Sequence, residues 1–270
     1  MDTSKPVLLV DSSYATIYRY TALQHWYRLQ NKDEDTATGS GFDWLANTTF
    51  MSKLQERFLG GFDKLRKTHD IPYSNFVFCL DQPRATLWRT RILPYYKANR
   101  VSSPALGQVL EIMREKWLPD LETRLGVNRL AVETMEADDV IACATRSALA
   151  AGFPKVVILT SDKDFLQLCG DRVHIENLQG KRLVCEDADA VLLAHVLLGD
   201  VADNVPKCIP RAGKKTIEKL VADRGALERL LEDPAVRECY DRNRRLIDFQ
   251  HIPVELAAQT AEKFEALLAS

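Results

Sequence analysis

The chain has 270 residues, 46% of them hydrophobic and 27% charged, which is typical of a globular protein with one large domain or one domain and a small appendage. A net charge of −2 excludes a protein that is basic overall, and the lack of a long apolar stretch excludes a transmembrane helix. The six cysteines stand singly and the five histidines are dispersed, which argues against a zinc site. We expect an intracellular protein, cytoplasmic or nuclear, with no signal peptide and no membrane partner.

Three short apolar runs predict the strands of a parallel sheet. Residues 6–10 (PVLLV), 76–80 (FVFCL) and 155–160 (KVVILT) are rich in β-branched or aromatic side chains, as strands buried on both faces usually are. Helical periodicity occupies residues 50–67 and 139–152. This alternation of strand and helix favours an α/β fold.

The remaining segments complete the predicted architecture. Residues 31–41 (NKDEDTATGSG) have the composition of an exposed loop. From about residue 190 the strand signals fade, and short helices separated by proline and glycine take over. The sequence therefore predicts an α/β core with a small helical appendage.

Aspartates follow each of the three predicted strands. Asp11 follows the first strand, Asp81 follows the second, and Asp162 and Asp164 come just after the third. In open α/β sheets the carboxyl ends of the strands form the edge where ligands bind. Any one of these residues alone is more often a turn or helix-capping residue, but the three strand ends together favour a shared site.

The segment ETMEADDVIAC (133–143) adds acids at the start of a helix. Glu136, Asp138 and Asp139 are close in sequence, and i, i+3 spacing puts Glu136 and Asp139 on one helix face. A helix N-terminus stabilises a negative charge by only about 0.3–1 kcal/mol, too little to hold so many carboxylates together. Divalent cations would be sufficient, and oxygen ligands without His or Cys select Mg²⁺ or Mn²⁺ over zinc.

Residues 82–100 combine basic and aromatic side chains directly after Asp81. The segment contains five cations and no acid, with one tryptophan and two tyrosines among them. This pattern suits a nucleic-acid backbone with stacked bases, or alternatively a solvated basic face over core aromatics. Its position beside Asp81 favours phosphate contact.

The segment GDVADNVPKCIPRAGKKTIEKLV (199–221) has features of a phosphate-binding turn. Asp200 and Asp203 are three residues apart, so they can share one helical face or turn. A turn rich in proline and glycine, followed by lysines at a helix start, suits a phosphate, although lysine-capped loops are common.

Together these motifs resemble the structure-specific 5′ nucleases, a family that includes flap endonucleases, phage 5′-3′ exonucleases and the 5′-nuclease domain of bacterial DNA polymerases. LLVDSSYATIYR resembles the family's first strand, and DQPRATLWRTRILPYYKANR resembles its arch signature. EADD, TSDKDFLQL and GDVADN match its later acidic motifs in order, and NRRLIDFQHIP resembles its closing segment.

The resemblance implies a PIN-like fold, with a mostly parallel central sheet flanked by helices, a helical arch and a helix-hairpin-helix appendage. It divides the chain into a catalytic core at 1–190, with the arch at about 82–116, a DNA-binding subdomain at 191–240, and a C-terminal segment at 241–270 that packs back on the core.

The resemblance also assigns site residues. Nine acids would surround two Mg²⁺ ions, for which Mn²⁺ would substitute: Asp11, Asp81, Glu136, Asp138 and Asp139 at the first ion, and Asp162, Asp164, Asp200 and Asp203 at the second. The catalytic cations at the scissile phosphate would be Arg89, Lys97 and Arg100. Further DNA contacts would come from Arg19, Arg84, Arg91, Tyr96, Lys207, Arg211, Gly213, Lys214, Lys215 and Thr216.

The chain departs from the family pattern after GDVADN. The family has a glycine-rich hairpin there, whereas this chain has Lys207, Cys208, Arg211 and Ala212 and keeps Gly213. Glycines let backbone amides approach a phosphate closely. Without them, the hairpin is expected to differ in geometry from that of the family, and the K⁺ ion that the family's hairpin carbonyls would hold is called into question. The added cations Lys207 and Arg211 could compensate electrostatically.

The implied function is that of a monomeric, metal-dependent 5′ flap endonuclease with 5′-3′ exonuclease activity, in DNA replication or repair. Its partner would be DNA with a 5′ flap, a nick or a free 5′ end. Three alternatives stay open. A catalytically silent DNA-binding relative is disfavoured by the complete set of acids, a PIN-type RNA nuclease by the arch and hairpin, and a phosphatase by the basic segment.

Overall fold

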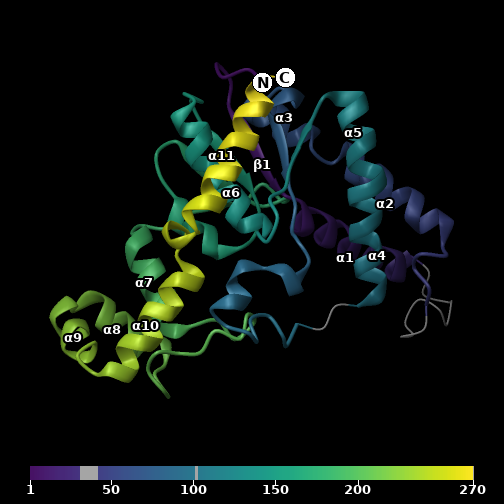
Figure 1. The fold of residues 1–270 in the computed structure, drawn as a ribbon. Helices are drawn as coiled ribbons and strands as arrows, with labels where there is room; N and C mark the ends of the chain where they lie inside the picture. The colour runs from purple at the N-terminus through teal and green to yellow at the C-terminus, as the bar shows by residue number, and fades with distance from the viewer. Residues whose placement is uncertain (31–41, 101–102, 270) are drawn as a thin grey trace.

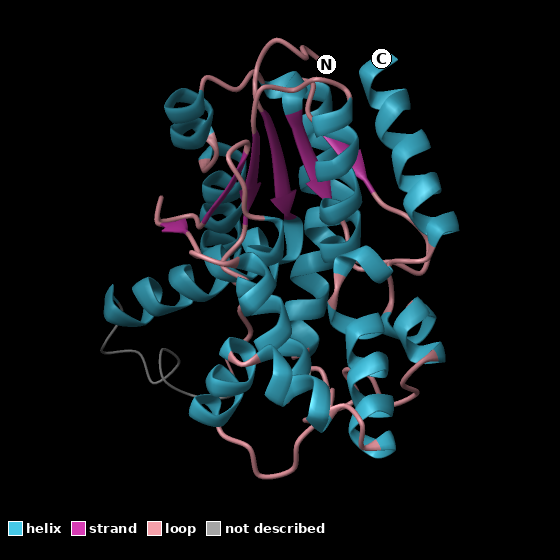
Figure 2. Ribbon diagram, turned by 90° about the vertical axis from the view of Figure 1, so that its left-hand side faces the viewer, coloured by secondary structure: helices cyan, strands magenta, loops and turns pink. Residues whose placement is uncertain are grey.

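A six-stranded sheet lies at the centre of the computed structural model, which describes residues 1–30, 42–100 and 103–269 (Figures 1 and 2). The strand order is β3-β2-β1-β4-β5-β6, with β6 antiparallel to β5 and all other neighbours parallel. The strands are β1 (Val7–Asp11), β2 (Phe76–Cys79), β3 (Asn128–Leu130), β4 (Val156–Leu159), β5 (Val173–Glu176) and β6 (Arg182–Leu183). The predicted loop at 31–41 lies outside the described residues.

The three strands predicted from the sequence are confirmed as β2, β1 and β4, which lie side by side in the middle of the sheet. The sequence did not reveal β3, β5 and β6. These strands lie toward the two edges of the sheet, and polar residues such as Asn128 in β3 and His174 in β5 break the continuous apolar signal. β3 and β6 are also very short.

Helices cover both faces of the sheet, because successive strand residues point to opposite faces. Leu9 and Ile158 contact the core under α6 (Ala137–Ala150) and α11 (Val254–Ala269), whereas Leu8 and Phe78 contact the core on the other side. Figure 1 shows α11 running along α6, with the two chain ends close together. The helices of the other face are α1 (Ser12–Gln30), α2 (Thr48–Gly60), α3 (Asp63–His69), α4 (Pro104–Ile112) and α5 (Leu118–Leu125).

The single helix predicted at residues 50–67 is two helices, α2 and α3, separated at Gly61. A Cβ atom at Gly61 would collide with the guanidinium of Arg19 and with the backbone oxygen of Arg57. Arg19 therefore packs against the break between the two helices. A π-helical turn, Met113–Trp117, joins α4 to α5.

The region predicted as a helical appendage contains four helices that share a small apolar core. The helices are α7 (Ala188–Leu198), α8 (Lys214–Ala222), α9 (Arg224–Leu230) and α10 (Pro234–Ile247), and the predicted boundary at residue 240 falls inside α10. Leu197 and Ile217 bring α7 and α8 together in this core, and Figure 1 shows the four helices at the end of the molecule opposite the chain termini.

The segment predicted as a helical arch is a regular α-helix only from Pro104 onward. Before that, the described residues form short 3₁₀ turns, and Leu87, Leu93 and Tyr96 are buried against Val196 of α7 and α10. Residues 101–102 lie outside the described part. The other short helical turns are Tyr73–Asn75, Lys163–Leu168 and Phe249–His251.

None of the helices in the described ranges combines the length and the apolar character that crossing a bilayer requires.

Candidate active site

The acids at the strand ends converge because β1 lies between β2 and β4. Asp11 ends β1, and it accepts hydrogen bonds from the Tyr14 backbone N–H at 2.8 Å and from Thr160 Oγ1 at 3.1 Å. Burial, together with the negative charges of Asp81 and Asp162, raises the pKa of Asp11 to about 7. A positive ion close to Asp11 would stabilise its ionised carboxylate.

Asp138 is the acid of the EADD segment that faces the strand ends. Burial and the negative charge of Asp11 raise the pKa of Asp138 well above its ordinary value. Asp81 is connected to the same helix, because its Oδ1 accepts a hydrogen bond from the Ala137 N–H at 2.9 Å and its Oδ2 accepts one from Ser13 Oγ at 2.5 Å. We call Asp11, Asp81 and Asp138 the strand-end acids.

Asp139 and Arg89, which the sequence predicted as a metal ligand and a catalytic cation, are engaged with each other in this structure. Asp139 is fully buried, and its two oxygens accept hydrogen bonds from the two terminal nitrogens of Arg89, each at 2.7 Å. Trp88 Nε1 also donates to Asp139 at 2.9 Å, while Arg89 Nε donates to the Leu246 carbonyl at 2.7 Å. Both oxygens of Asp139 are thus engaged in this structure, and the Arg89 guanidinium points at Asp139, Glu136 and the Leu246 carbonyl.

Lys97 and Tyr96 connect Glu136 with Asp203. The Lys97 ammonium pairs with Glu136 Oε1 and lies 3.4 Å from Asp203 Oδ2, and its backbone N–H donates to the Asp203 carbonyl at 2.9 Å. The Tyr96 hydroxyl lies 3.0 Å from Glu136 and 3.1 Å from Asp203. Burial lowers the pKa of Lys97, but the negative charges of Glu136, Asp138 and Asp203 together raise it above its ordinary value. Tyr96 is buried, which contradicts its predicted DNA contact.

Arg100 forms the outer part of this network. Its Nη2 pairs with Asp203 Oδ1, its side chain is 48% exposed, and its backbone carbonyl accepts a hydrogen bond from Arg84 at 3.0 Å. Arg114, which the sequence did not single out, donates to the Asp81 carbonyl at 2.5 Å. Asp81 and Glu136 thus have four cationic side chains in their surroundings: Arg84, Lys97, Arg100 and Arg114.

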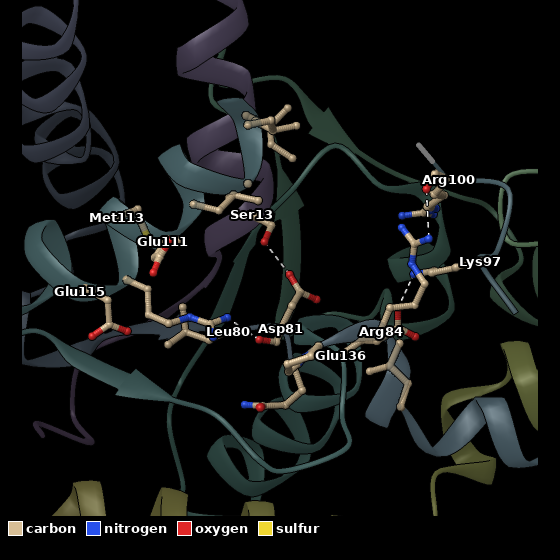
Figure 3. Close-up of a pocket in the computed structure, with 18 residues that line it drawn as sticks. Ser13, Leu80, Asp81, Arg84, Lys97, Arg100, Glu111, Met113, Glu115 and Glu136 are labelled. Carbon is tan, nitrogen blue, oxygen red and sulfur yellow. Dashed lines mark hydrogen bonds and ion pairs between the residues drawn. The ribbon is translucent and has the colours of Figure 1, made fainter. Parts of the chain in front are cut away.

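A pocket of about 680 Å³ opens beside these residues, between the segment after β2 and α4. Asp81 and Glu136 line it together with Arg84, Lys97 and Arg100. Figure 3 shows these three cations at one end of the pocket, with Asp81 near its middle. The pocket therefore offers positive charge immediately next to crowded carboxylates.

A second group of ligand atoms lies where the sheet meets the appendage. His195 Nδ1 is 3.3 Å from Asp164 Oδ1, and His195 Nε2 is 3.9 Å from Asp200 Oδ2. Among the described residues, these three form the one group whose ligand atoms all lie within 4.8 Å of one another. Burial raises the pKa of Asp164 to about 6, although His195 opposes the rise. We call Asp164, His195 and Asp200 the α7 group.

His195 was not among the predicted site residues, because its spacing from Asp164 and Asp200 forms no regular motif. The α7 group combines two carboxylates with a histidine, whereas the sequence predicted metal ligands with oxygen atoms only. Asp162 lies between the two sets of acids, where its Oδ1 accepts a hydrogen bond from the Asp164 N–H at 2.9 Å.

The donor atoms fit divalent cations. The strand-end acids are carboxylates that burial and mutual repulsion make unfavourable without a positive partner. The α7 group offers two carboxylates and an imidazole in a cluster small enough for one ion.

A family model for the 5′-3′ exonuclease N-terminal, resolvase-like domain matches residues 6–193. The chain belongs to this family. It is 32% identical over 212 residues to a 5′-3′ exonuclease of Streptomyces coelicolor, covering 69% of this chain and 68% of that protein. It is also 36% identical over 176 residues to the thermostable DNA polymerase I of Thermus aquaticus, of which it spans 20%.

Solved structures share the fold over nearly the whole length. The flap endonuclease of bacteriophage T5, in complex with DNA and metal ions, matches with a TM-score of 0.69 at 13% identity, over 98% of this chain and all of that one. The 5′-exonuclease of the same phage with bound zinc matches with a TM-score of 0.68 at 16% identity, over 98% and 99% of the two chains. The family resemblance and the PIN-like fold predicted from the sequence are confirmed.

Arg19 does not lie where the sequence predicted. Its side chain is buried, with the guanidinium 4.2 Å from the ring centre of Phe62 and 5.4 Å from that of Phe58. Burial lowers the pKa of Arg19 to about 10. This geometry contradicts a contact with DNA and gives Arg19 a packing role.

The loop between α7 and α8 keeps its cations at the surface. Arg211 is exposed and has a φ of +63°, so a non-glycine residue adopts the left-handed conformation in this glycine-poor segment. Lys207 Nζ donates to the Ala212 carbonyl at 3.2 Å, so an ammonium already occupies one carbonyl of this loop. The other predicted DNA-contact residues are also exposed: Arg91, Gly213, Lys214, Lys215 and Thr216.

Proposed function

We propose that this chain is a metal-dependent, structure-specific 5′ nuclease that hydrolyses DNA phosphodiesters near a junction of single-stranded and duplex DNA. The observation that carries the proposal is the crowding of the strand-end acids next to a pocket that Arg84, Lys97 and Arg100 line. The α7 group lines a second pocket, and Asp162 interacts electrostatically with both Asp11 and Asp164. Family membership and the DNA complex of a related fold support it.

The strand-end acids and Glu136 would hold a first divalent ion, and the α7 group with Asp162 and Asp203 would hold a second. Mg²⁺ is the proposed physiological ion at the first position, with Mn²⁺ as a substitute. When bound, two such ions activate a water molecule and stabilise the attacking and leaving oxygens of a phosphodiester.

Lys97 and Arg100 hold and orient the scissile phosphate. Both cations are fixed before substrate binds, because Glu136 and Asp203 hold their side chains at the edge of the pocket. A phosphate in the pocket is met by donors that need little rearrangement, which is the condition for electrostatic stabilisation of a transition state. Arg84 and Arg114 extend this positive surface along the pocket.

The exposed cations of the appendage would bind the duplex. Arg211, Lys214 and Lys215 lie on the loop and the first turn of α8, where backbone N–H groups and side-chain charge both favour phosphate. The preferred substrate is thus a DNA in which a duplex rests on the appendage and a single strand enters the pocket.

The test uses a 5′-flap DNA labelled at its 5′ end, and the flap strand alone, with Mg²⁺ and with EDTA. The wild type should cut the flap DNA near the junction only with Mg²⁺, and Asp164→Asn should lose this activity. The control Asp171→Asn changes an exposed acid outside the site and should cut normally. Near-UV circular dichroism verifies folding. Tight DNA binding without cutting in Mg²⁺ or Mn²⁺ would contradict the proposal.

A further inference from the structure

His195 is placed so that both of its ring nitrogens face carboxylates. One nitrogen lies 3.3 Å from Asp164 and the other lies 3.9 Å from Asp200, a separation beyond a hydrogen bond. Either ring nitrogen of an imidazole can bind a metal ion through its lone pair when it carries no proton. A divalent cation bound by one of these nitrogens would bring positive charge close to both carboxylates.

The separations suit ligands of one ion. Transition-metal ions bind imidazole nitrogen and carboxylate oxygen at about 2.0–2.2 Å, which places neighbouring ligand atoms roughly 3–4 Å apart. One ligand atom from each residue of the α7 group lies within 4.8 Å of the ligand atoms of the other two. His195 is 21% exposed, so an ion can reach it from solvent.

The backbone fixes this arrangement at the end of α7. The Gly199 N–H donates to the His195 carbonyl at 2.8 Å, and Gly199 has a φ of +63°. A Cβ atom there would collide with the carbonyl oxygens of Val205 and Pro206. The chain then turns back through paired backbone hydrogen bonds of 2.9 and 2.7 Å between Asp200 and Val205. Glycine thus allows Asp200 to lie beside His195.

We propose that His195 is a nitrogen ligand of the second metal ion, and that this nitrogen makes the α7 group prefer a transition metal such as Mn²⁺ over Mg²⁺. The inference rests on the proposed function, because it concerns one of the two ions of that site. Magnesium favours oxygen ligands in near-ideal octahedral geometry, whereas imidazole favours transition metals. The strand-end acids, which are all oxygen, would not share this preference.

The experiment measures ion binding to the DNA-free protein, so that it does not depend on cutting. Calorimetric titrations with Mn²⁺ and with Mg²⁺ count the ions and give their affinities, and pulsed EPR of bound Mn²⁺ detects a directly coordinated nitrogen. The samples are the wild type, His195→Asn, His195→Asp and the control His25→Asn, which changes an exposed histidine of α1.

We expect two Mn²⁺ ions and a nitrogen signal in the wild type and in His25→Asn. His195→Asn should lose the signal and bind the second Mn²⁺ at least about tenfold more weakly, a loss of about 1.4 kcal/mol, with the first ion within about twofold. His195→Asp should lose the signal, keep the second ion and bind Mn²⁺ and Mg²⁺ with more similar affinities.

Binding of two Mn²⁺ ions to the wild type without a nitrogen signal would overturn the proposal, as would binding of a single ion or unchanged affinity in His195→Asn. The wild-type spectrum alone suffices if a variant fails to fold. Failure of the proposed function is a separate result, since it would appear as absent DNA cutting in a protein that still shows the nitrogen signal.

Discussion

The strand-end acids and the α7 group differ in how the fold builds them. Asp11 and Asp81 are set by the sheet, because they follow the neighbouring strands β1 and β2, and Asp138 faces them from the first turn of α6. The α7 group depends on a helix end, a glycine turn and a 3₁₀ turn that meet where core and appendage join. The first group is all carboxylate, whereas the second contains an imidazole. One active site thus joins a sheet-built half and a loop-built half.

The largest expected effect is at the centre of the strand-end acids. Asp11→Asn removes a charge that the first ion needs, and we expect turnover on flap DNA to fall by about a thousandfold or more. In EDTA the same variant should be at least as stable as the wild type, because it removes a buried carboxylate crowded by Asp81 and Asp162. Thermal unfolding checks this, and clear destabilisation would contradict the electrostatic account.

The pH dependence of stability sharpens the same point. The pKa of Asp11 is raised from 3.8 to about 7, so the folded state binds more protons than the unfolded state between these values. In EDTA, stability should therefore fall as pH rises from about 4 to 7, and the fall should be smaller in Asp11→Asn. The free energy of unfolding of both proteins is measured by denaturant unfolding as a function of pH. The same pH dependence in the wild type and in Asp11→Asn would contradict a raised pKa of Asp11.

A second large effect is expected at Lys97. Lys97→Ala should lower turnover by about a hundredfold, because it removes a positioned donor from the scissile phosphate. DNA affinity should change by less than about threefold, since many other phosphate contacts remain. Single-turnover kinetics and fluorescence anisotropy separate the two quantities. Equal losses in both would mean that Lys97 serves binding rather than catalysis.

An intermediate effect is expected at the α7 group. Gly199→Ala forces a side chain into a left-handed conformation and against two carbonyls, at a cost of about 1–3 kcal/mol. Binding of the second Mn²⁺ should weaken, while the first ion should bind as in the wild type. Gly60→Ala is the matched control, because a Cβ there meets nothing within 4 Å. If Gly199→Ala weakened the binding of both Mn²⁺ ions to a similar extent, the α7 group and the strand-end acids would not be independent metal sites.

The smallest effect is expected on the appendage. Lys215→Ala should weaken binding to duplex-containing DNA two- to threefold at moderate salt, and it should reduce the slope of log affinity against log salt by about 1. Turnover at saturating DNA should stay the same. An unchanged salt slope would mean that the exposed first turn of α8 does not contact phosphate.

The acids that follow strands could be predicted from the sequence, because an apolar run shows where the strand ends. Asp11 and Asp81 were assigned in this way, and the predicted central strands were confirmed. The partners of each charge could not be predicted. Nothing in the sequence distinguished Asp139 from its neighbour Asp138. The tertiary structure shows that Arg89 and Trp88 donate hydrogen bonds to the Asp139 carboxylate.

In the loop-built half, Asp164 and Asp200 were assigned from the sequence, but His195 was not. His195 lies in an apolar helix, and its approach to Asp200 depends on the turn at Gly199 rather than on a periodic spacing. Arg19 shows the opposite error, because a basic residue near a motif can be buried between aromatic rings.

Anomalous diffraction from crystals soaked in Mn²⁺ tests the two-half active site most directly. The account predicts two manganese peaks, one among Asp11, Asp81 and Asp138, and one bounded by Asp164, His195 and Asp200 with the imidazole as a ligand. A single peak, or a pair of peaks that leaves either group empty, would contradict it.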